Sequence, residues 1–300
     1  MLKSDRYLWI LWALTIILSC KDDVKSPGLQ PSEEGKFKNP LLASAPDPWV
    51  IQKEEWYYVT HTTGDHLLLY RTRQMSDLAQ ATVKTIWSPP SSGANSKNIW
   101  APELHFINNK WYFYYAADDG LNQNHRLWVL ENSSADPFEG QWIDKGEVQL
   151  PDDRWAIDGT IFEHNGQLYF LWSGWEGTTN IRQDIYITRM ADPWTADGGR
   201  TMISKPELPW ELAGGSPSVN EAPQFLHRGN KVFVTYSASG CWTDEYRLGL
   251  LYADATADIL SATSWTKSPE PVFEKNPSSL AYGPGHNCFF KSLDGTEDWM

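Results

Sequence analysis

A hairpin pattern that recurs five times constrains this chain more than any other feature of its sequence. In each copy a polar residue heads a short apolar strand, a turn follows, and an aromatic strand returns. The third copy is the clearest, because the Asn165-Gly166 dipeptide separates residues 156–162 from the aromatic run 168–172. Asn-Gly between apolar runs favours a two-residue hairpin turn, since both positions require positive φ. The polar residues that head the five copies are Asp47, Glu103, Asp158, Glu221 and His286.

The copies recur at a period of roughly 60 residues, and such self-similarity indicates a solenoid or a propeller. Two more strands are expected after each of the first four hairpins. The third strands are expected at 67–72, 126–130, 184–188 and 247–252, and the fourth strands at 82–87, 141–148, 201–204 and 264–273. Four antiparallel strands per repeat form one propeller blade. The sequence therefore predicts an all-β fold, a five-bladed β-propeller over residues 39–300. A β-sandwich, the alternative, gives no reason for a fixed period headed by a polar residue.

The fifth copy is shorter than the others. It reaches Met300 within what would be its second strand. We therefore expect the fifth blade to be cut short at the C-terminus, unless residues 29–40 supply a further strand. An open blade edge would be an aggregation hazard, because its backbone groups lack partners.

The five heads are expected to meet, because the first strand of every propeller blade lines the central axis. Carboxylates crowded into a partly buried cavity cannot all ionise at their ordinary pKa values. Like charge and desolvation raise some of these values, and nearby donors lower others. Cleavage of a glycosidic bond needs such a spread, with one acid protonated at neutral pH and one carboxylate ionised.

The composition narrows the range of partners. The chain has 25 basic and 38 acidic residues and a formal net charge of −13. Nucleic-acid binding requires a basic face, so this charge argues against a nucleic-acid partner and also disfavours a polyanionic substrate. The 17 Trp, 13 Tyr and 11 Phe residues suit blades packed face to face, and they also suit stacking on sugar rings.

Residues 1–20 have the features of a secretion signal rather than of a folded element. Lys3 and Arg6 give a basic start, and the apolar run 7–18 is far shorter than the roughly 20 residues of a membrane-spanning helix. The run ends at Cys20, and the sequence around it resembles the lipobox of bacterial lipoproteins, in which that cysteine is lipidated after cleavage. An uncleaved anchor is the alternative interpretation.

The segment after Cys20 predicts how the protein is attached. Lys21-Asp22-Asp23 resembles the acidic export signal of some surface-displayed lipoproteins of Gram-negative bacteria. Residues 21–38 contain Pro27, Pro31 and mixed charges, and we expect them to form a flexible tether. Membrane contact is therefore expected only through a lipid anchor, at the bacterial outer membrane or cell surface, with a periplasmic location as the alternative.

Motifs around the five heads together resemble the family-43 glycoside hydrolases. These motifs are Ala45-Pro46-Asp47-Pro48-Trp49, Ile99-Trp100-Ala101-Pro102-Glu103, Ile157-Asp158-Gly159, Asn220-Glu221-Ala222-Pro223 and Gly283-Pro284-Gly285-His286-Asn287. The resemblance covers residues 39–300. The related sucrose- and fructan-cleaving propellers carry Asn-Asp-Pro and Arg-Asp-Pro signatures, which do not occur at Asp47 or Asp158.

The resemblance implies a role for each of three acids. Asp47 is expected to be the general base that activates the attacking water, and Glu221 the general acid that protonates the leaving oxygen. Asp158 is expected to orient Glu221 and to keep its pKa raised by like-charge repulsion. The implied outcome is inversion, for which base and acid lie roughly 6.5–9.5 Å apart so that a water fits between them. A solvated carboxylate at a strand end is the simpler interpretation of one such acid, but not of three in these motifs.

The resemblance also implies a role for His286, which matches the family histidine on the axis beneath the site. A structural calcium or sodium ion reached through water is implied there, with a plain hydrogen-bonded histidine as the alternative, and no cofactor is expected to be required. Loops on the face of the strand heads, among them 61–66 and 239–246, are expected to shape the pocket. Trp100, Trp175 and Trp242 are candidates for stacking on sugar, with ordinary packing as the alternative.

The activity implied by the resemblance is that of an inverting, exo-acting α-L-arabinofuranosidase, which releases arabinose from neutral plant hemicellulose or arabinan. A β-xylosidase or an endo-arabinanase of the same family is the alternative, because the catalytic acids are shared and only the loops differ. A non-catalytic, carbohydrate-binding surface lipoprotein is the alternative from another class. A decayed site of that kind is expected to lack at least one acid, and all three are present.

Overall fold

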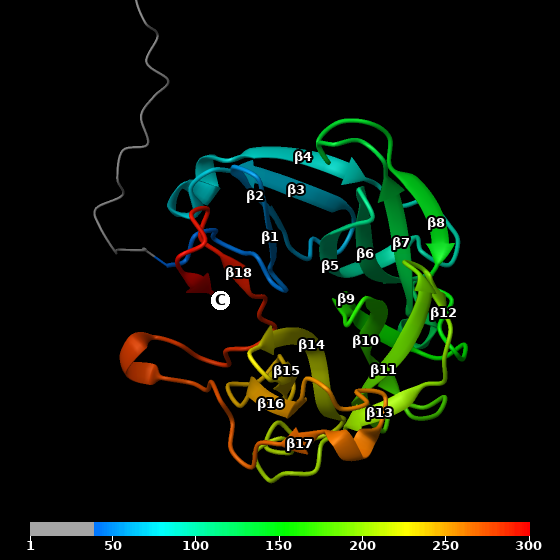
Figure 1. The fold of residues 1–300 in the computed structure, drawn as a ribbon, viewed down its shortest axis with the longest axis vertical. Coiled ribbons are helices and arrows are strands. Elements are labelled where there is room, and N and C mark those ends of the chain that lie inside the picture. The colour runs from blue at the N-terminus through cyan, green and yellow to red at the C-terminus, as the bar shows by residue number, and fades with distance from the viewer. Residues whose placement is uncertain (1–38) are drawn as a thin grey trace, which may run out of the picture. The chain divides into compact units, whose positions relative to one another are not determined.

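The structure, a computed structural model, describes residues 39–300. The expected signal peptide, Cys20 and the expected tether lie outside the described residues. Within 39–300, antiparallel sheets follow one another around a central axis (Figure 1). No helix of this described part is long and apolar enough to span a membrane.

Four blades are antiparallel meanders in which the first strand lies nearest the axis (Figure 1). Blade 1 contains β1 (Trp49–Lys53), β2 (Trp56–Thr60), β3 (Leu67–Thr72) and β4 (Thr82–Trp87). Blade 2 contains β5 (Lys97–Ile107), β6 (Lys110–Asp118), β7 (Arg126–Asn132) and β8 (Ile143–Glu147). Blade 3 contains β9 (Ala156–His164), β10 (Gln167–Trp175), β11 (Arg182–Asp192), β12 (Thr195–Ala196) and β13 (Thr201–Ser204). Blade 4 contains β14 (Ser218–Arg228), β15 (Lys231–Ala238), β16 (Arg247–Asp254) and β17 (Thr266–Lys267).

Short elements complete the described chain. The fifth copy contributes β18 (Phe290–Lys291) and β19 (Asp298–Trp299). The 3₁₀ helices are η1 (Met75–Gln80), η2 (Asn122–Asn124), η3 (Ala262–Ser264) and η4 (Pro277–Ser279).

The predicted four-stranded repeat is confirmed for the first four copies. Strands expected at 67–72, 82–87 and 201–204 occur at those residues. The fourth strand of blade 4 differs, because β17 has two residues in place of the strand predicted over 264–273. Pro269 and Pro271 follow β17, and proline has no N–H to donate to a ladder, so pairing is interrupted there and resumes only as an isolated bridge between Leu248 and Phe273.

The fifth copy forms a two-stranded sheet that packs on blade 1. Phe290 of β18 lies opposite Trp299 of β19. The ring of Tyr57 stacks on Trp299 at 6.2 Å and meets the edge of Phe290 at 5.7 Å. In Figure 1, β18 (red) lies between β1 and β14, so the fifth copy stands between the first and fourth blades.

Every copy bends its inner segment at the same place. The residue at the bend has a left-handed backbone, with φ between 44° and 54°, and these residues are Asp47, Ala101, Asp158, Ala222 and His286. Strand pairing shifts register at this bend in blades 2, 3 and 4. A left-handed backbone costs a residue with a side chain roughly 1–2 kcal/mol. Strain is thus concentrated around the axis, as it often is at functional sites.

The shared bend shows that Glu103 is not the structural counterpart of the other heads in the second copy. The counterpart of Asp47 and Asp158 is Ala101, whereas Glu103 lies two residues further along β5. Glu103 therefore finds other partners: its Oε1 accepts a hydrogen bond from Gln224 at 2.7 Å, and its Oε2 lies 2.8 Å from His105 Nε2.

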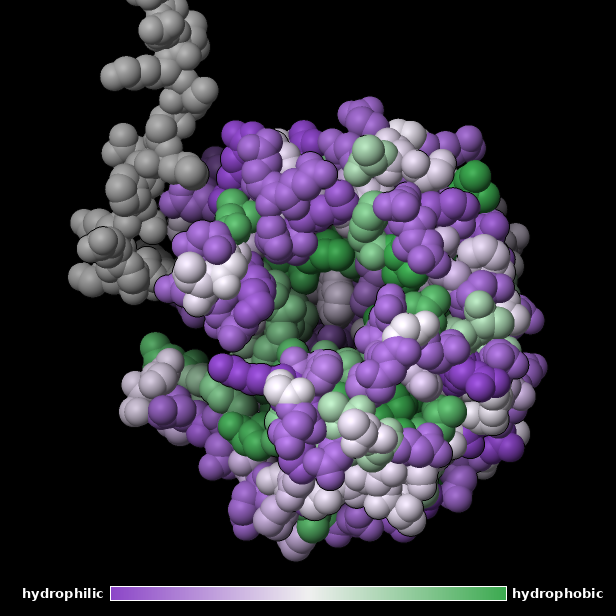
Figure 2. Space-filling view, viewed as in Figure 1, coloured by the Kyte–Doolittle hydropathy of each residue, from purple (hydrophilic) through white to green (hydrophobic). Residues whose placement is uncertain are grey.

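Aromatic side chains fill the spaces between blades, as the composition predicts. Trp111, Phe113 and Tyr115 are fully buried between blades 1 and 2, and Phe170 is fully buried between blades 2 and 3. Figure 2 shows hydrophilic residues over most of the visible outer surface and apolar residues around a central hollow. Packing between blades therefore orders the inner strands that carry the heads.

Gly159, next to Asp158 in β9, permits close contact between blades 2 and 3. A Cβ at this position would lie 2.6 Å from the Phe170 ring and 2.8 Å from Leu127. We expect Gly159→Ala to lower the free energy of unfolding by about 1–3 kcal/mol through overpacking, measured by urea denaturation. The control is Gly177→Ala, since a Cβ there meets nothing within 4 Å. Equal stability of the two variants would contradict this account.

Candidate active site

Three carboxylates and one imidazole meet where the inner strands begin. Asp47 precedes β1, Asp158 lies in β9, Glu221 lies in β14 and His286 precedes β18. The charges of Asp47, Asp158 and His286 all act on the pKa of Glu221, so the four side chains share one electrostatic environment. The structure therefore brings four of the five heads together.

Asp47 is the most open of the three acids, with 28% of its side chain exposed. Its Oδ1 lies 3.1 Å from His286 Nδ1, and its Oδ2 accepts a hydrogen bond from Thr62 Oγ1 at 2.6 Å. Burial alone would raise the pKa of Asp47, but the His286 charge and these hydrogen bonds lower it to about 2. Asp47 is therefore ionised at neutral pH, as a general base must be.

His286 is the cation that compensates the carboxylates. Burial lowers its pKa, but the charges of Asp47 and Asp158 raise it to about 10. The ring is therefore an imidazolium at neutral pH, and its contact with Asp47 is a charge-assisted hydrogen bond, which is stronger than a neutral one. Its backbone N–H donates to Ser237 Oγ at 2.7 Å, so the residue is held at both ends.

Glu221 and Asp158 are both buried, with 7% and 5% of the residue exposed. Burial raises the pKa of Glu221, and the Asp158 charge raises it further. Burial also raises the pKa of Asp158, although the His286 charge and the Ala222 N–H, which donates to Asp158 Oδ2 at 3.0 Å, act against it. Two carboxyl groups in one buried site do not both ionise readily, so Glu221 keeps its proton at neutral pH.

Motif analysis does not single out Thr62, Ser237 and Tyr246, which contact the heads directly. Thr62 joins Asp47 to the bend of blade 2, because its Oγ1 also accepts a hydrogen bond from the Ala101 N–H at 2.7 Å. The Tyr246 hydroxyl donates to Glu221 Oε1 at 2.7 Å. The sequence signal for Thr62 and Tyr246 is their place in loops that a propeller puts at this face.

The three candidate tryptophans lie in different environments. Trp100 is half-buried, and its ring stacks on His125 at 4.0 Å. Trp175 is 4% exposed and stacks on Trp155 at 4.8 Å, so the structure places it in the core between blades 2 and 3 rather than on the pocket surface. Trp242 is 60% exposed, in the loop that carries Tyr246.

The described residues do not offer a direct ligand set for a calcium or sodium ion. No group of three His, Cys, Asp or Glu side chains among residues 39–300 is arranged to hold a metal. His286 Nδ1 is taken by Asp47, and Asn287 Nδ2, a buried donor without a partner among these residues, would repel a cation. Calcium takes roughly six to eight oxygen ligands, so the axial ion stays a prediction and no step below depends on it.

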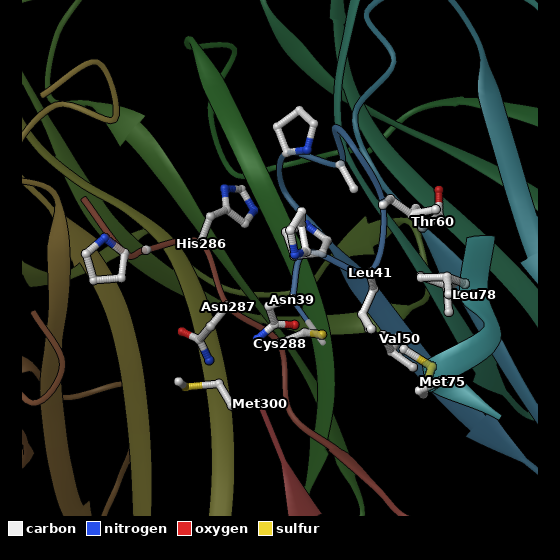
Figure 3. A pocket seen from close by; sticks show the side chains of 18 of the residues that line it. Asn39, Leu41, Val50, Thr60, Met75, Leu78, His286, Asn287, Cys288 and Met300 are labelled. Atoms are coloured by element: carbon white, nitrogen blue, oxygen red, sulfur yellow. The ribbon is translucent and has the colours of Figure 1, made fainter. Parts of the chain in front are cut away.

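A cavity of about 710 Å³ lies beside the acid cluster, between blade 1 and the segment that precedes β18 (Figure 3). Its apolar lining includes Leu41, Val50, Met75 and Leu78, and His286 stands on its own segment at one side. Apolar walls suit packing rather than proton transfer. The acid cluster, not this cavity, is therefore the candidate catalytic centre.

Residues 37–300 match the family model of the glycosyl hydrolases family 43. The chain belongs to this family. The match includes the whole described part of the chain and all four converging heads, and it confirms the resemblance seen in the motifs.

Several similar proteins are named as α-L-arabinofuranosidases. An extracellular exo-α-(1→5)-L-arabinofuranosidase of Streptomyces avermitilis is 42% identical over 267 residues, which covers 87% of this chain and 55% of that protein. A protein of the same name from Streptomyces chartreusis is 39% identical, with 87% and 80% covered. The crystal structure of an α-L-arabinofuranosidase from Lactobacillus brevis has a TM-score of 0.81 at 35% identity, covering 87% of this chain and 84% of that chain. The chain spans about half the length of the first of these relatives.

Replacing His286 tests its control over Asp47. In His286→Asn the raising effect of burial on the Asp47 pKa is no longer opposed by the charge and hydrogen bond of His286. A base works only when ionised, so activity is lost as pH falls through its pKa, and we expect the acidic limb of kcat/KM to move up by at least about one unit. The pH profile on an aryl glycoside checks this. His227→Asn, at an exposed position, is the control; an unmoved limb in His286→Asn would refute the assignment.

Proposed function

We propose that the chain is an inverting, exo-acting α-L-arabinofuranosidase that removes arabinose from arabinan or from arabinose-bearing hemicellulose. The observation that carries the proposal is that the pKa values of two acids in one site are shifted in opposite directions. The pKa of Asp47 is lowered to about 2, and that of the buried Glu221 is raised. The names of the similar proteins support the choice of arabinose over other sugars.

The mechanism follows from these charge states. Asp47 takes a proton from a water molecule, whose oxygen attacks the anomeric carbon. The bond from that carbon to the leaving oxygen breaks, and Glu221 gives its proton to the leaving oxygen. The product has inverted configuration, because the water attacks from the face opposite the leaving group. Asp47 then loses its proton to solvent, and Glu221 regains one.

Asp158 acts on the acid rather than on the substrate. Its carboxylate accepts a hydrogen bond from the N–H of Ala222, the residue after Glu221, at 3.0 Å. It thereby fixes the bend of β14 that presents Glu221, and its nearby charge raises the Glu221 pKa. Trp242, an exposed residue of the loop that also carries Tyr246, is the proposed sugar-stacking residue of the three tryptophans.

Kinetics of two variants test the roles. We expect Asp47→Ala and Glu221→Ala each to lower turnover by about two to four orders of magnitude. A nitrophenyl leaving group needs little protonation, so this substrate should partly rescue Glu221→Ala but not Asp47→Ala. Asp197→Ala, at an exposed acid that pairs with Arg189, is the control. Equal losses on good and poor leaving groups for both variants would contradict the assignment of base and acid.

A substrate panel separates the alternatives. Release of nitrophenol from the aryl α-L-arabinofuranoside, with little action on the aryl β-xyloside, supports the proposal. Faster attack on linear arabinan with mixed oligosaccharide products indicates an endo-arabinanase, and preference for the xyloside a β-xylosidase. Saccharide binding without turnover indicates the non-catalytic alternative. The anomer formed first, read by proton NMR, tests inversion.

We also propose that Cys20 carries a lipid that holds the protein at the outer membrane or cell surface. The support is the lipobox-like sequence that ends at Cys20 and the acidic residues that follow it. The word extracellular in the names of two relatives supports export of this chain as well. A single acyl chain binds membranes only weakly, so stable attachment requires more than one, as a lipidated N-terminal cysteine can carry.

Fractionation tests the anchor. Cys20→Ala should block processing or release the protein from membranes, because the acceptor thiol is gone. Metabolic labelling with an alkyne fatty acid followed by membrane fractionation measures both effects. Cys241→Ala, at an exposed free thiol, is the matched control. Unchanged processing, labelling and membrane partition of Cys20→Ala would refute the proposal.

A further inference from the structure

A chain of hydrogen bonds runs from the backbone of His286 to the carboxyl group of Glu221. The His286 N–H donates to Ser237 Oγ at 2.7 Å. Ser237 is hydrogen-bonded to the phenol of Tyr246, and the Tyr246 hydroxyl donates to Glu221 Oε1 at 2.7 Å. Ser237 lies in β15, and Tyr246 directly precedes β16. The second and third strands of blade 4 therefore hold this series of hydrogen bonds in place.

The His286 N–H determines the direction of donation along these hydrogen bonds. A backbone N–H donates and never accepts, so Ser237 Oγ accepts there and gives its own proton to the Tyr246 oxygen. That oxygen already accepts from Ser237, and its single proton is left for Glu221. Oε1 of Glu221 therefore faces a donor whether Glu221 is protonated or not.

The surroundings keep the Tyr246 hydroxyl from turning away. Ser237 is fully buried, and Tyr246 is 4% exposed. A Cβ on residue 285 would lie 2.1 Å from the Tyr246 ring, so only glycine lets the segment before His286 close over that ring. The position of the hydroxyl is thus determined by packing as well as by hydrogen bonds.

We infer that Tyr246 is a positioning residue that reserves Oε1 of Glu221 as an acceptor and places the catalytic proton on Oε2. A neutral carboxyl group carries its proton on one oxygen and accepts best through the other, and a fixed donor at Oε1 makes that oxygen the acceptor. Oε2 then gives its proton to the leaving oxygen of the substrate. This inference rests on the proposed function, because it concerns the acid step of that reaction.

One residue of the fifth copy thereby serves both halves of the reaction. The side chain of His286 pairs with the base Asp47, and its backbone starts the chain to the acid. The charged groups that face Glu221 are Asp158 from β9, Asp47 and His286, with the Cys241 thiol in the loop before β16. Burial and the Asp158 charge raise the pKa of Glu221, and the Tyr246 hydrogen bond lowers it.

Tyr246→Phe removes the donor and keeps the ring. The proton of Glu221 can then occupy either oxygen, and the ionised form loses a stabilising donor. We expect kcat/KM on methyl α-L-arabinofuranoside, a poor leaving group, to fall about 10- to 100-fold, and that on the 2,4-dinitrophenyl arabinoside less than about 3-fold. Loss of the donor raises the Glu221 pKa, and activity is lost as pH rises through that pKa. The basic limb should therefore move about one unit to higher pH.

A matched control and a second variant keep the test decisive. Tyr112→Phe removes another buried tyrosine hydroxyl, which donates to Glu131 at 3.0 Å in blade 2. In this control, neither the leaving-group dependence of kcat/KM nor the basic limb of its pH profile should change. In Ser237→Ala the Tyr246 hydroxyl becomes a weaker donor, so a smaller shift of the same sign is expected, and this variant carries the test if Tyr246→Phe does not fold.

The outcomes separate this inference from the proposed function. An active parent protein whose Tyr246→Phe variant loses activity equally on both substrates, or shows an unmoved basic limb, overturns the role of Tyr246 alone. A parent protein that turns over neither arabinoside overturns the proposed function, and this inference with it. A leaving-group-dependent loss together with the limb shift supports both.

Discussion

The ion pair between Asp47 and His286 determines the charge state of the whole site. It joins the first copy of the repeat to the fifth, and the His286 charge lowers the pKa of Asp47, Asp158 and Glu221 alike. Without a buried cation, three carboxyl groups would meet on the axis with repulsion alone between them, and an uncompensated buried charge is strongly destabilising. With it, Asp47 can ionise fully while the buried Glu221 retains its proton. The site thus depends on where the fifth copy places a single imidazolium.

Strain at the bends is the structural counterpart of this charge arrangement. Asp47, Asp158 and His286 take a left-handed backbone themselves, and Glu221 is followed by Ala222, which does so. An unstrained strand would alternate these side chains between two faces. The bend breaks the alternation at one level in every copy, and so turns neighbouring side chains towards one another. The backbone departs from its preferred conformation where the site requires it, and the packing of the blades offsets the energetic cost of this strain.

The repeat and the acids could be predicted from the sequence because both are local. Alternating apolar residues and short polar turns, of which Asn165-Gly166 is the clearest, mark the hairpins, and the motifs identify Asp47, Asp158 and Glu221. What depends on contacts between copies could not be predicted. The position of Glu103 relative to the bend requires the register of β5, and the burial of Trp175 requires its stack on Trp155. The prolines after β17 are a local signal that does predict where that strand ends, once their missing N–H groups are considered.

Glu211 shows why burial alone does not make an acid catalyst. It is fully buried in the segment between β13 and β14, ten residues before Glu221 in the sequence, yet its surroundings are opposite in kind. Its oxygens accept from Lys267 at 3.0 Å, from Tyr236 at 2.8 Å, and from the backbone N–H groups of Glu207 and Leu208 at 2.9 and 2.8 Å. Donors therefore occupy both oxygens, and a cation lies beside them, so neither oxygen is free to face a substrate. Glu221 faces the Asp158 carboxylate and the fixed Tyr246 hydroxyl, and this imbalance between donors and like charge keeps its proton available to the substrate.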